Sequence, residues 1–83
     1  MQIHFELYAS LMQFLPPSAK RHRAEVAVAD NATPYQVLDR FGVPRDQAHL
    51  VMLNGVFLHQ PQRDESCLTD GDVLAVWPPV AGG

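Results

Sequence analysis

The sequence has a single cysteine, Cys67, and no run of 18 consecutive apolar residues. One cysteine cannot form an internal disulfide, so a reducing compartment is the simplest expectation. The missing apolar run argues against a membrane-spanning helix. Residues 1–5 also lack the basic and apolar segments of a secretory signal. The sequence therefore predicts a cytoplasmic protein with no membrane partner.

The sequence also lacks an excess of positive charge. Its net charge is −3 and its isoelectric point is near 5.7, which argues against nucleic acid as the main partner. One basic cluster stands out, Lys20-Arg21-His22-Arg23. We interpret it as a solvated loop, with a docking patch for an acidic partner as the alternative.

Motifs of enzymes and metal sites are missing as well. There is no glycine-rich phosphate loop, no His-Glu-x-x-His and no cysteine pair. The four histidines lack metal-ligand spacing, and Cys67 is most simply a buried core residue. We therefore expect no active site, no metal and no bound cofactor. The histidines are His4, His22, His49 and His59.

The chain has 83 residues, which is enough for one domain. Its first half predicts a hairpin followed by a helix. Apolar residues alternate over residues 3–9 and again over 23–28, which is typical of two paired strands. An apolar turn at residues 11–15 separates them. Thr33, Pro34 and Gln36 fit the cap, first position and capping box of a helix of about ten residues. Gly42 and Pro44 end it.

The second half predicts three more strands. Residues 50–53 and 56–58 flank Asn54-Gly55, a strong tight-turn signal. Residues 60–66 are polar, and Asp64, Glu65, Asp70 and Asp72 are most simply solvated turn residues. Residues 73–77 are apolar throughout, which predicts a central strand, paired in parallel with the N-terminal one. This order indicates an α+β fold, the β-grasp or ubiquitin-like fold, with a mixed sheet of four to five strands and one main helix across one face.

One helix covers only one face of such a sheet. The other face would then expose an apolar patch that includes Phe57 and is large enough to bind a partner. Alternatively, the segments at residues 11–15 and around Leu68 cover it. The sequence leaves both possibilities open.

A tail at residues 78–83 follows the β-grasp domain, residues 1–77. Pro78 and Pro79 favour an extended strut, and Gly82 and Gly83 fit a channel too narrow for other residues. The tail therefore predicts that the Gly83 carboxyl group is presented to another protein's active site. A carboxylate must be activated first, normally by ATP, for which this chain has no site. Sulfur would then give a thiocarboxylate and an amine an isopeptide bond, and both remain open.

The ending Trp77-Pro78-Pro79-Val80-Ala81-Gly82-Gly83 resembles that of the MoaD/ThiS family of sulfur carriers. It is closest to the small subunit of molybdopterin synthase, which ends in Phe-Pro-Pro-Val-x-Gly-Gly. The segments 68–73 and 53–55 are also similar to that family. Residues 14–17, with the basic cluster that follows, differ from the molybdopterin branch and resemble ubiquitin-like domains that are fused to other bacterial proteins.

The resemblance implies a carrier without an active site of its own. An adenylating enzyme of the ubiquitin-activating type would use ATP to activate Gly83, which becomes a thiocarboxylate and donates sulfur in cofactor biosynthesis, first of all that of molybdopterin. A synthase large subunit would receive the tail, with Phe57 and Trp77 as docking residues. The alternatives are a thiamine-pathway carrier and a ubiquitin-like protein modifier or interaction module. The residues that would thread the partner's channel are Pro78, Pro79, Val80, Ala81 and Gly82.

Overall fold

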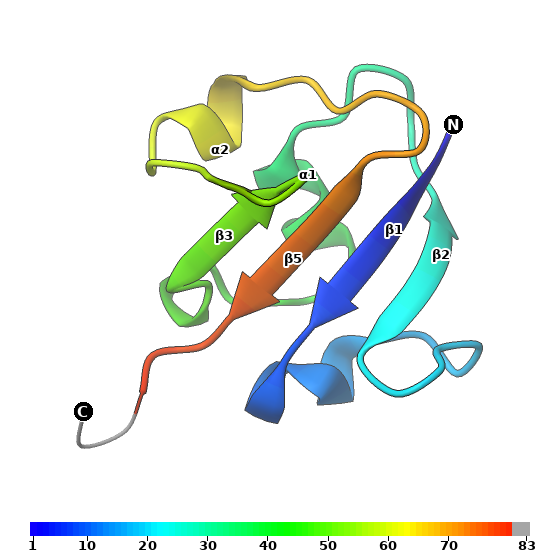
Figure 1. Cartoon of the computed structure of the whole chain (residues 1–83), viewed down its shortest axis with the longest axis vertical. Helices are drawn as coiled ribbons and strands as arrows, with labels where there is room; N and C mark the ends of the chain where they lie inside the picture. The colour runs from blue at the N-terminus through cyan, green and yellow to red at the C-terminus, as the bar shows by residue number, and fades with distance from the viewer. Residues whose placement is uncertain (81–83) are drawn as a thin grey trace.

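The computed structural model describes residues 1–80, and its centre is a five-stranded sheet in the order β2-β1-β5-β3-β4 (Figure 1). β1 and β5 are parallel, and the other neighbouring strands are antiparallel. The strands are β1 (Gln2–Leu7), β2 (Arg23–Ala27), β3 (Leu50–Leu53), β4 (Val56–Phe57) and β5 (Val73–Trp77). The predicted fold class, the central position of residues 73–77 and their parallel pairing are confirmed.

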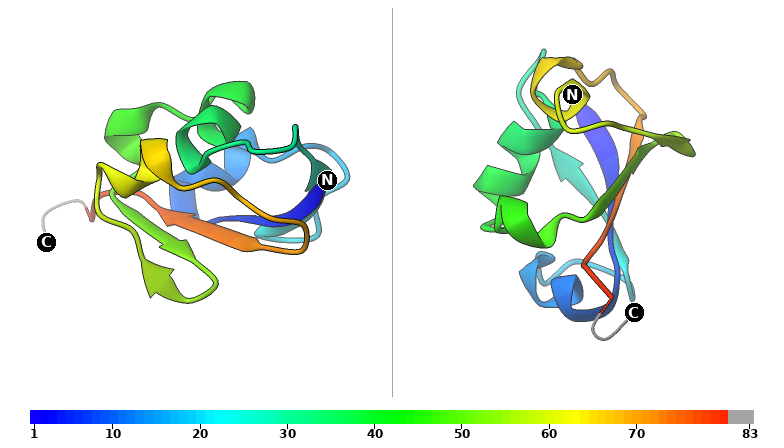
Figure 2. Two further views of the ribbon diagram at one scale, coloured as in Figure 1. Left: turned by 90° about the horizontal axis from the view of Figure 1, so that it is seen from above. Right: turned by 90° about the vertical axis from the view of Figure 1, so that its left-hand side faces the viewer.

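Four short helices connect or cover the strands. They are η1 (Ala9–Phe14), α1 (Pro34–Arg40), η2 (Arg45–Gln47) and α2 (Gln62–Glu65), of which η1 and η2 are 3₁₀-helices. α1 and α2 lie on the same side of the sheet, and no helix of residues 1–80 lies on the opposite face (Figure 2).

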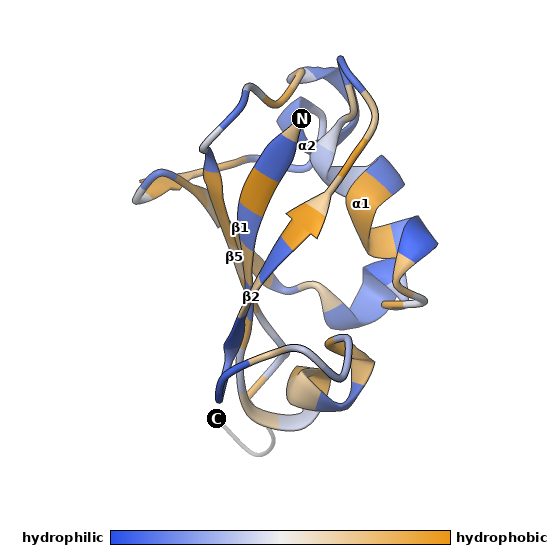
Figure 3. Cartoon of the chain, turned by 90° about the vertical axis from the view of Figure 1, so that its right-hand side faces the viewer, coloured by the Kyte–Doolittle hydropathy of each residue, from blue (hydrophilic) through white to orange (hydrophobic). Residues whose placement is uncertain are grey.

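The core lies between α1 and the covered face of the sheet. Ile3, Phe5 and Leu7 of β1 are at most 1% exposed, and Leu74 and Val76 of β5 are fully buried beside them. Each such side chain contributes about 1.5–3 kcal/mol on burial. The alternation along β1 and β2 is visible in Figure 3. Leu11 and Leu68 belong to this same core cluster, so their burial is on the helix side.

α1 has the predicted start, but it is shorter than expected. The Thr33 hydroxyl accepts a hydrogen bond from the Gln36 N–H, and the Gln36 side chain accepts one from the Thr33 N–H, as in a capping box. The helix has seven residues rather than about ten. It ends early because Gly42 has φ +78° and the Val43 N–H donates to the Leu38 carbonyl, which closes a Schellman motif.

Two turns are joined at the other end of the sheet. Asn54 and Gly55 both have positive φ, as a type I′ turn requires. The Asn54 amide donates to Asp72 at 2.9 Å, and Asp72 also accepts hydrogen bonds from the N–H and hydroxyl of Thr69. Burial raises the pKa of Asp72, but these hydrogen bonds outweigh it and hold the pKa below its ordinary value. Asp72 is therefore a structural acceptor, and its interpretation as a merely solvated turn residue is wrong.

Three further predictions need correction. The first strand ends at Leu7, because Ala9 has φ +51° and begins η1. The polar run at residues 60–66 contains α2 rather than only loop. Cys67 is exposed rather than buried, because it follows α2 in a segment in which Leu68 is the residue that enters the core.

Candidate functional site

The tail leaves the sheet at the end of its central strand. Pro78 is half-buried and Pro79 is exposed, and the Val80 side chain is 78% exposed. We call residues 77–80 the tail root. Ala81, Gly82 and Gly83 lie outside the described residues, so their predicted roles, and the domain boundary after residue 77, stay predictions.

An aromatic stack flanks the tail root. The Trp77 ring stacks on the Tyr8 ring with centroids 4.3 Å apart and planes 2° from parallel, and Tyr8 stacks on His22 at 4.7 Å. The Tyr8 hydroxyl donates to Glu6 at 2.9 Å. Burial, together with this hydrogen bond and the charge of Glu6, raises the pKa of Tyr8, and Arg23 opposes the shift. The stack therefore fixes the orientation of the last residue of β5.

A groove of about 450 Å³ lies beside the tail root. Its walls are residues 9–10 at the start of η1 and residues 49–50 at the start of β3, together with the tail root itself. The His49 N–H donates to the Trp77 carbonyl at 3.0 Å, which ties the second wall to β5. The side chains around the groove are mainly apolar, so it fits an apolar group of a partner that grips the tail.

Arg63 holds the second wall of this groove. Its guanidinium group is buried and donates to the carbonyls of Leu58, Ala48 and His49 at 3.0, 2.9 and 3.2 Å. The last two acceptors directly precede β3. The sequence gives no local signal for this clamp, because Arg63 sits in a polar run and its acceptors come from other segments.

The helix-free face of the sheet, here called the open face, changes from charged to apolar across the strands. Registered partners share a face, so one row crosses all five strands. Phe57 is 42% exposed, so neither residues 11–15 nor Leu68 cover the apolar side. Trp77 pairs with Leu50, two residues from Met52, so the two predicted docking residues share this face. The row consists of Arg23, Glu6, Ala75, Met52 and Phe57.

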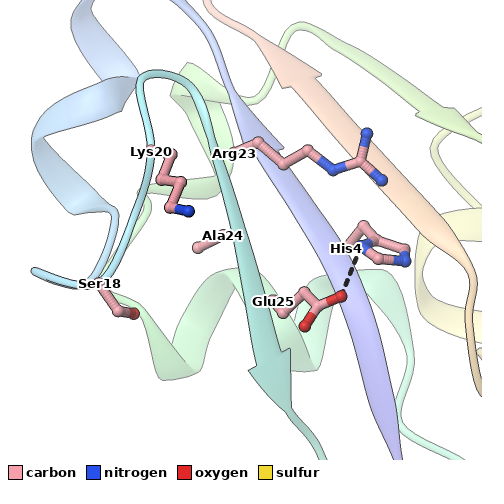
Figure 4. A pocket seen from close by; sticks show the side chains of 6 residues that line it. All are labelled: His4, Ser18, Lys20, Arg23, Ala24 and Glu25. Atoms are coloured by element: carbon pink, nitrogen blue, oxygen red, sulfur yellow. Dashed lines mark ion pairs between the residues drawn. The ribbon is translucent and has the colours of Figure 1, made fainter.

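The basic cluster lies at the β2 edge of the sheet, away from the β4 edge that carries Phe57. A depression of about 550 Å³ there is lined by His4, Ser18, Lys20, Arg23, Ala24 and Glu25 (Figure 4). His4 Nδ1 lies 3.5 Å from Glu25 and has no hydrogen-bond partner among residues 1–80. Within residues 1–80, no group of three His, Cys, Asp or Glu side chains could hold a metal ion, and no helix is long and apolar enough to cross a membrane.

The comparison with known families identifies the domain. A family model described as Mut7-C ubiquitin matches residues 1–82. The chain belongs to this family. No curated protein matches the sequence.

Solved structures share the ubiquitin-like fold of this family member. The solution structure of the Haloferax volcanii HVO 2177 protein has a TM-score of 0.74 and 25% identity over 100% of this chain and 87% of that one. The crystal structure of SAMP1 from Haloferax volcanii has a TM-score of 0.65 and 24% identity over the whole of both chains. The complex of subunits 1 and 2 of the molybdopterin-converting factor from Helicobacter pylori gives a TM-score of 0.57 and 19% identity, also over both whole chains. The predicted resemblance to the MoaD/ThiS family is confirmed. The matches to SAMP1 and to the Helicobacter pylori complex, both below 25% identity, show the fold alone.

Proposed function

We propose that this ubiquitin-like domain is a sulfur carrier whose Gly83 is converted to a thiocarboxylate that donates sulfur in cofactor biosynthesis. Molybdopterin ranks first among the candidate cofactors. The observation that carries the proposal is the exposed tail root. Val80 is 78% exposed, two prolines after the end of the central strand, and the sequence continues to Ala81, Gly82 and Gly83. The proposal takes the carboxylate of Gly83 to be the terminal one, which the mass of the intact protein from cells checks first.

The chemistry requires a partner enzyme. A Gly83 carboxylate oxygen attacks the α-phosphorus of ATP, pyrophosphate leaves, and an acyl-adenylate forms. The terminal sulfur of a persulfide donor then attacks the acyl carbon and AMP leaves, which gives an acyl disulfide. A thiol attacks the donor's inner sulfur, so that the S–S bond breaks, the thiocarboxylate leaves and the donor and the thiol form a disulfide. ATP and its binding site belong to an adenylating enzyme of the ubiquitin-activating type.

The length of the tail limits where this partner sits. Six residues beyond Trp77 reach at most about 20 Å when fully extended. The partner's active site therefore lies within that distance of Trp77, and its surface contacts the tail root, the groove beside it and the open face with Phe57. A synthase large subunit is the second expected partner, and the complex of subunits 1 and 2 from Helicobacter pylori is a precedent for that kind of assembly.

Removal of Gly83 tests the proposal. The shortened chain should gain no thiocarboxylate when it is incubated with the adenylating enzyme, ATP and a sulfur donor, whereas the full chain gains the mass of a sulfur in place of an oxygen. Its thermal unfolding should be unchanged, since among residues 1–80 the core cluster ends at Val76 and Val80 is already exposed. A chain with one alanine added after Gly83 is the control for shortening, because its tail keeps every residue of the original. It should also fail, since its terminal carboxylate no longer belongs to Gly83. Sulfur on the shortened chain contradicts the proposal.

A protein modifier is the second candidate, because the fold does not separate the two functions. The TM-score is 0.65 with SAMP1, called a small archaeal modifier protein in a second structure, and 0.57 with the molybdopterin-converting complex. Diglycine remnants on lysines of other cellular proteins would indicate a modifier, and a thiocarboxylate on the free chain a carrier. If the thiocarboxylated chain donates sulfur to a thiazole synthase but not to a molybdopterin synthase, the thiamine branch replaces the molybdopterin branch.

A further inference from the structure

The basic cluster forms a rigid turn, which we call the basic hairpin (residues 20–23). The Lys20 N–H donates to the Arg23 carbonyl at 2.8 Å, the Arg23 N–H donates back at 3.2 Å, and Arg21 adopts a φ of +58°. The His22 carbonyl accepts a hydrogen bond from the Leu7 N–H at 2.9 Å. The hairpin is therefore anchored to the end of β1 and is more than a solvated loop.

The same hairpin lies beside the tail root. His22 stacks on Tyr8, and Tyr8 stacks on Trp77. Only one aromatic ring therefore separates the hairpin from the residue at which the tail begins. The sequence places these two features more than 50 residues apart, and the parallel pairing of β1 with β5 brings them together.

The hairpin concentrates positive charge on an otherwise acidic chain. It holds Lys20, Arg21 and Arg23, half of the chain's six Lys and Arg residues, and all three are exposed. In the described part of the chain, only Arg23 forms an ion pair among them, with Glu6 at 3.2 Å. The two cations that remain are available to an external anionic group.

We propose that the basic hairpin is a docking element for a carboxylate-rich protein surface at the rim of the channel that takes the tail. The inference rests on the proposed function, because the tail's reach of about 20 Å brings the channel's owner over the tail root and hence over the hairpin. The net charge of −3 argues against a nucleic acid as the occupant. Lys20 also lines the depression beside the hairpin, which is open to a carboxylate of a protein surface.

The test compares two variants that remove the same charge. Lys20→Gln with Arg21→Gln removes the two hairpin cations other than Arg23, and Arg40→Gln with Arg45→Gln removes two cations from α1 and η2. The assay is the kcat/KM for thiocarboxylation of the full chain by the adenylating enzyme with ATP and a sulfur donor. At about 0.05 M salt the hairpin variant should lose about 5–10-fold in kcat/KM with kcat unchanged, and at about 0.5 M salt the loss should fall below about twofold, because screening removes a steering effect.

The control variant should stay within about twofold of the unmodified chain at both salt concentrations. Equal kcat/KM and equal salt dependence for all three chains overturn the docking role, while sulfur on the unmodified Gly83 still supports the carrier. No sulfur on the unmodified chain overturns the proposed function and this inference with it. If the hairpin variant instead loses only binding to a labelled single-stranded RNA, or to inorganic phosphate, the occupant is not a protein and the proposal is overturned. Thermal unfolding of each variant checks that the fold is kept.

Discussion

Arg63 offers the sharpest test of how the tail root is held in place. Its side chain is 3% exposed, and all three of its hydrogen bonds within the described residues go to backbone carbonyls rather than to a carboxylate. Two of these carbonyls, of Ala48 and His49, stand directly before β3. The His49 N–H in turn holds the Trp77 carbonyl. Substitution Arg63→Ala therefore removes one group and leaves three acceptors without their donor.

The expected cost follows from these bonds. A hydrogen bond from a charged donor contributes about 1.5–3 kcal/mol, so three amount to about 5–9 kcal/mol before compensation. Water that enters the vacated space returns part of this, and so does the removal of the cost of burying a cation. About 3–5 kcal/mol then remains, consistent with about 1–3 kcal/mol for each buried acceptor left without a donor. A chain of this size is stable by about 4–12 kcal/mol in total. At about 4–8 °C per kcal/mol, Arg63→Ala should lower the melting temperature by at least about 12 °C.

Urea unfolding followed by the fluorescence of Trp77, the only tryptophan, measures this loss. The unfolding free energy of Arg63→Lys should lie between those of the unmodified chain and Arg63→Ala. An ammonium group keeps the charge, but it cannot donate to three carbonyls at once as the guanidinium group does. Arg45→Ala is the control, since Arg45 is half-exposed in its pair with Asp39 and the midpoint should hardly move. A loss below about 1 kcal/mol for Arg63→Ala would refute the reasoning, because the carbonyls would then be satisfied without the guanidinium group.

Two further predictions concern local hydrogen bonds. Thr33→Ala should destabilise the fold by about 1–2 kcal/mol because the Gln36 N–H loses the Thr33 hydroxyl as its acceptor, whereas Thr33→Ser should restore most of the urea midpoint. Since the pKa of Asp72 is lower in the folded chain than in the unfolded one, Asp72 stabilises the fold above its ordinary pKa, near 4, and that stability is lost as the pH falls through the lower folded value. Asp72→Asn should therefore flatten the fall in unfolding free energy between pH 7 and pH 3, and an unchanged pH profile contradicts the assignment.

Features set by neighbouring residues were predictable from the sequence. The capping box of α1 and the Asn54-Gly55 turn need only residues within three positions of one another, so their signals stand in the sequence itself. The helix length was overestimated because Phe41 continues the apolar pattern, although Gly42 already ends the hydrogen bonding. α2 has only four residues, too few for a hydrophobic period to be visible.

Features set by tertiary contacts could not be predicted in this way. The acceptors of Arg63 lie 5, 14 and 15 residues away along the chain, and nothing in a polar run distinguishes a buried guanidinium from a solvated one. Tyr8 stacks on Trp77 only once β1 lies beside β5, and His22 stacks on Tyr8 only once β2 is paired with β1. The sequence therefore predicts the tail and its two docking residues, Phe57 and Trp77, but it misses the groove, the stack and the place of the basic cluster.

The two prolines explain why the sheet ends where the tail begins. Up to Trp77, β5 has a neighbour on both sides, and its last carbonyl accepts from the His49 N–H. Pro78 and Pro79 have no N–H to donate, so β5 cannot continue between β1 and β3. The chain must leave the sheet after a residue whose ring and carbonyl are both held, by Tyr8 and His49. A partner that takes the tail as proposed would therefore meet it at a fixed starting point.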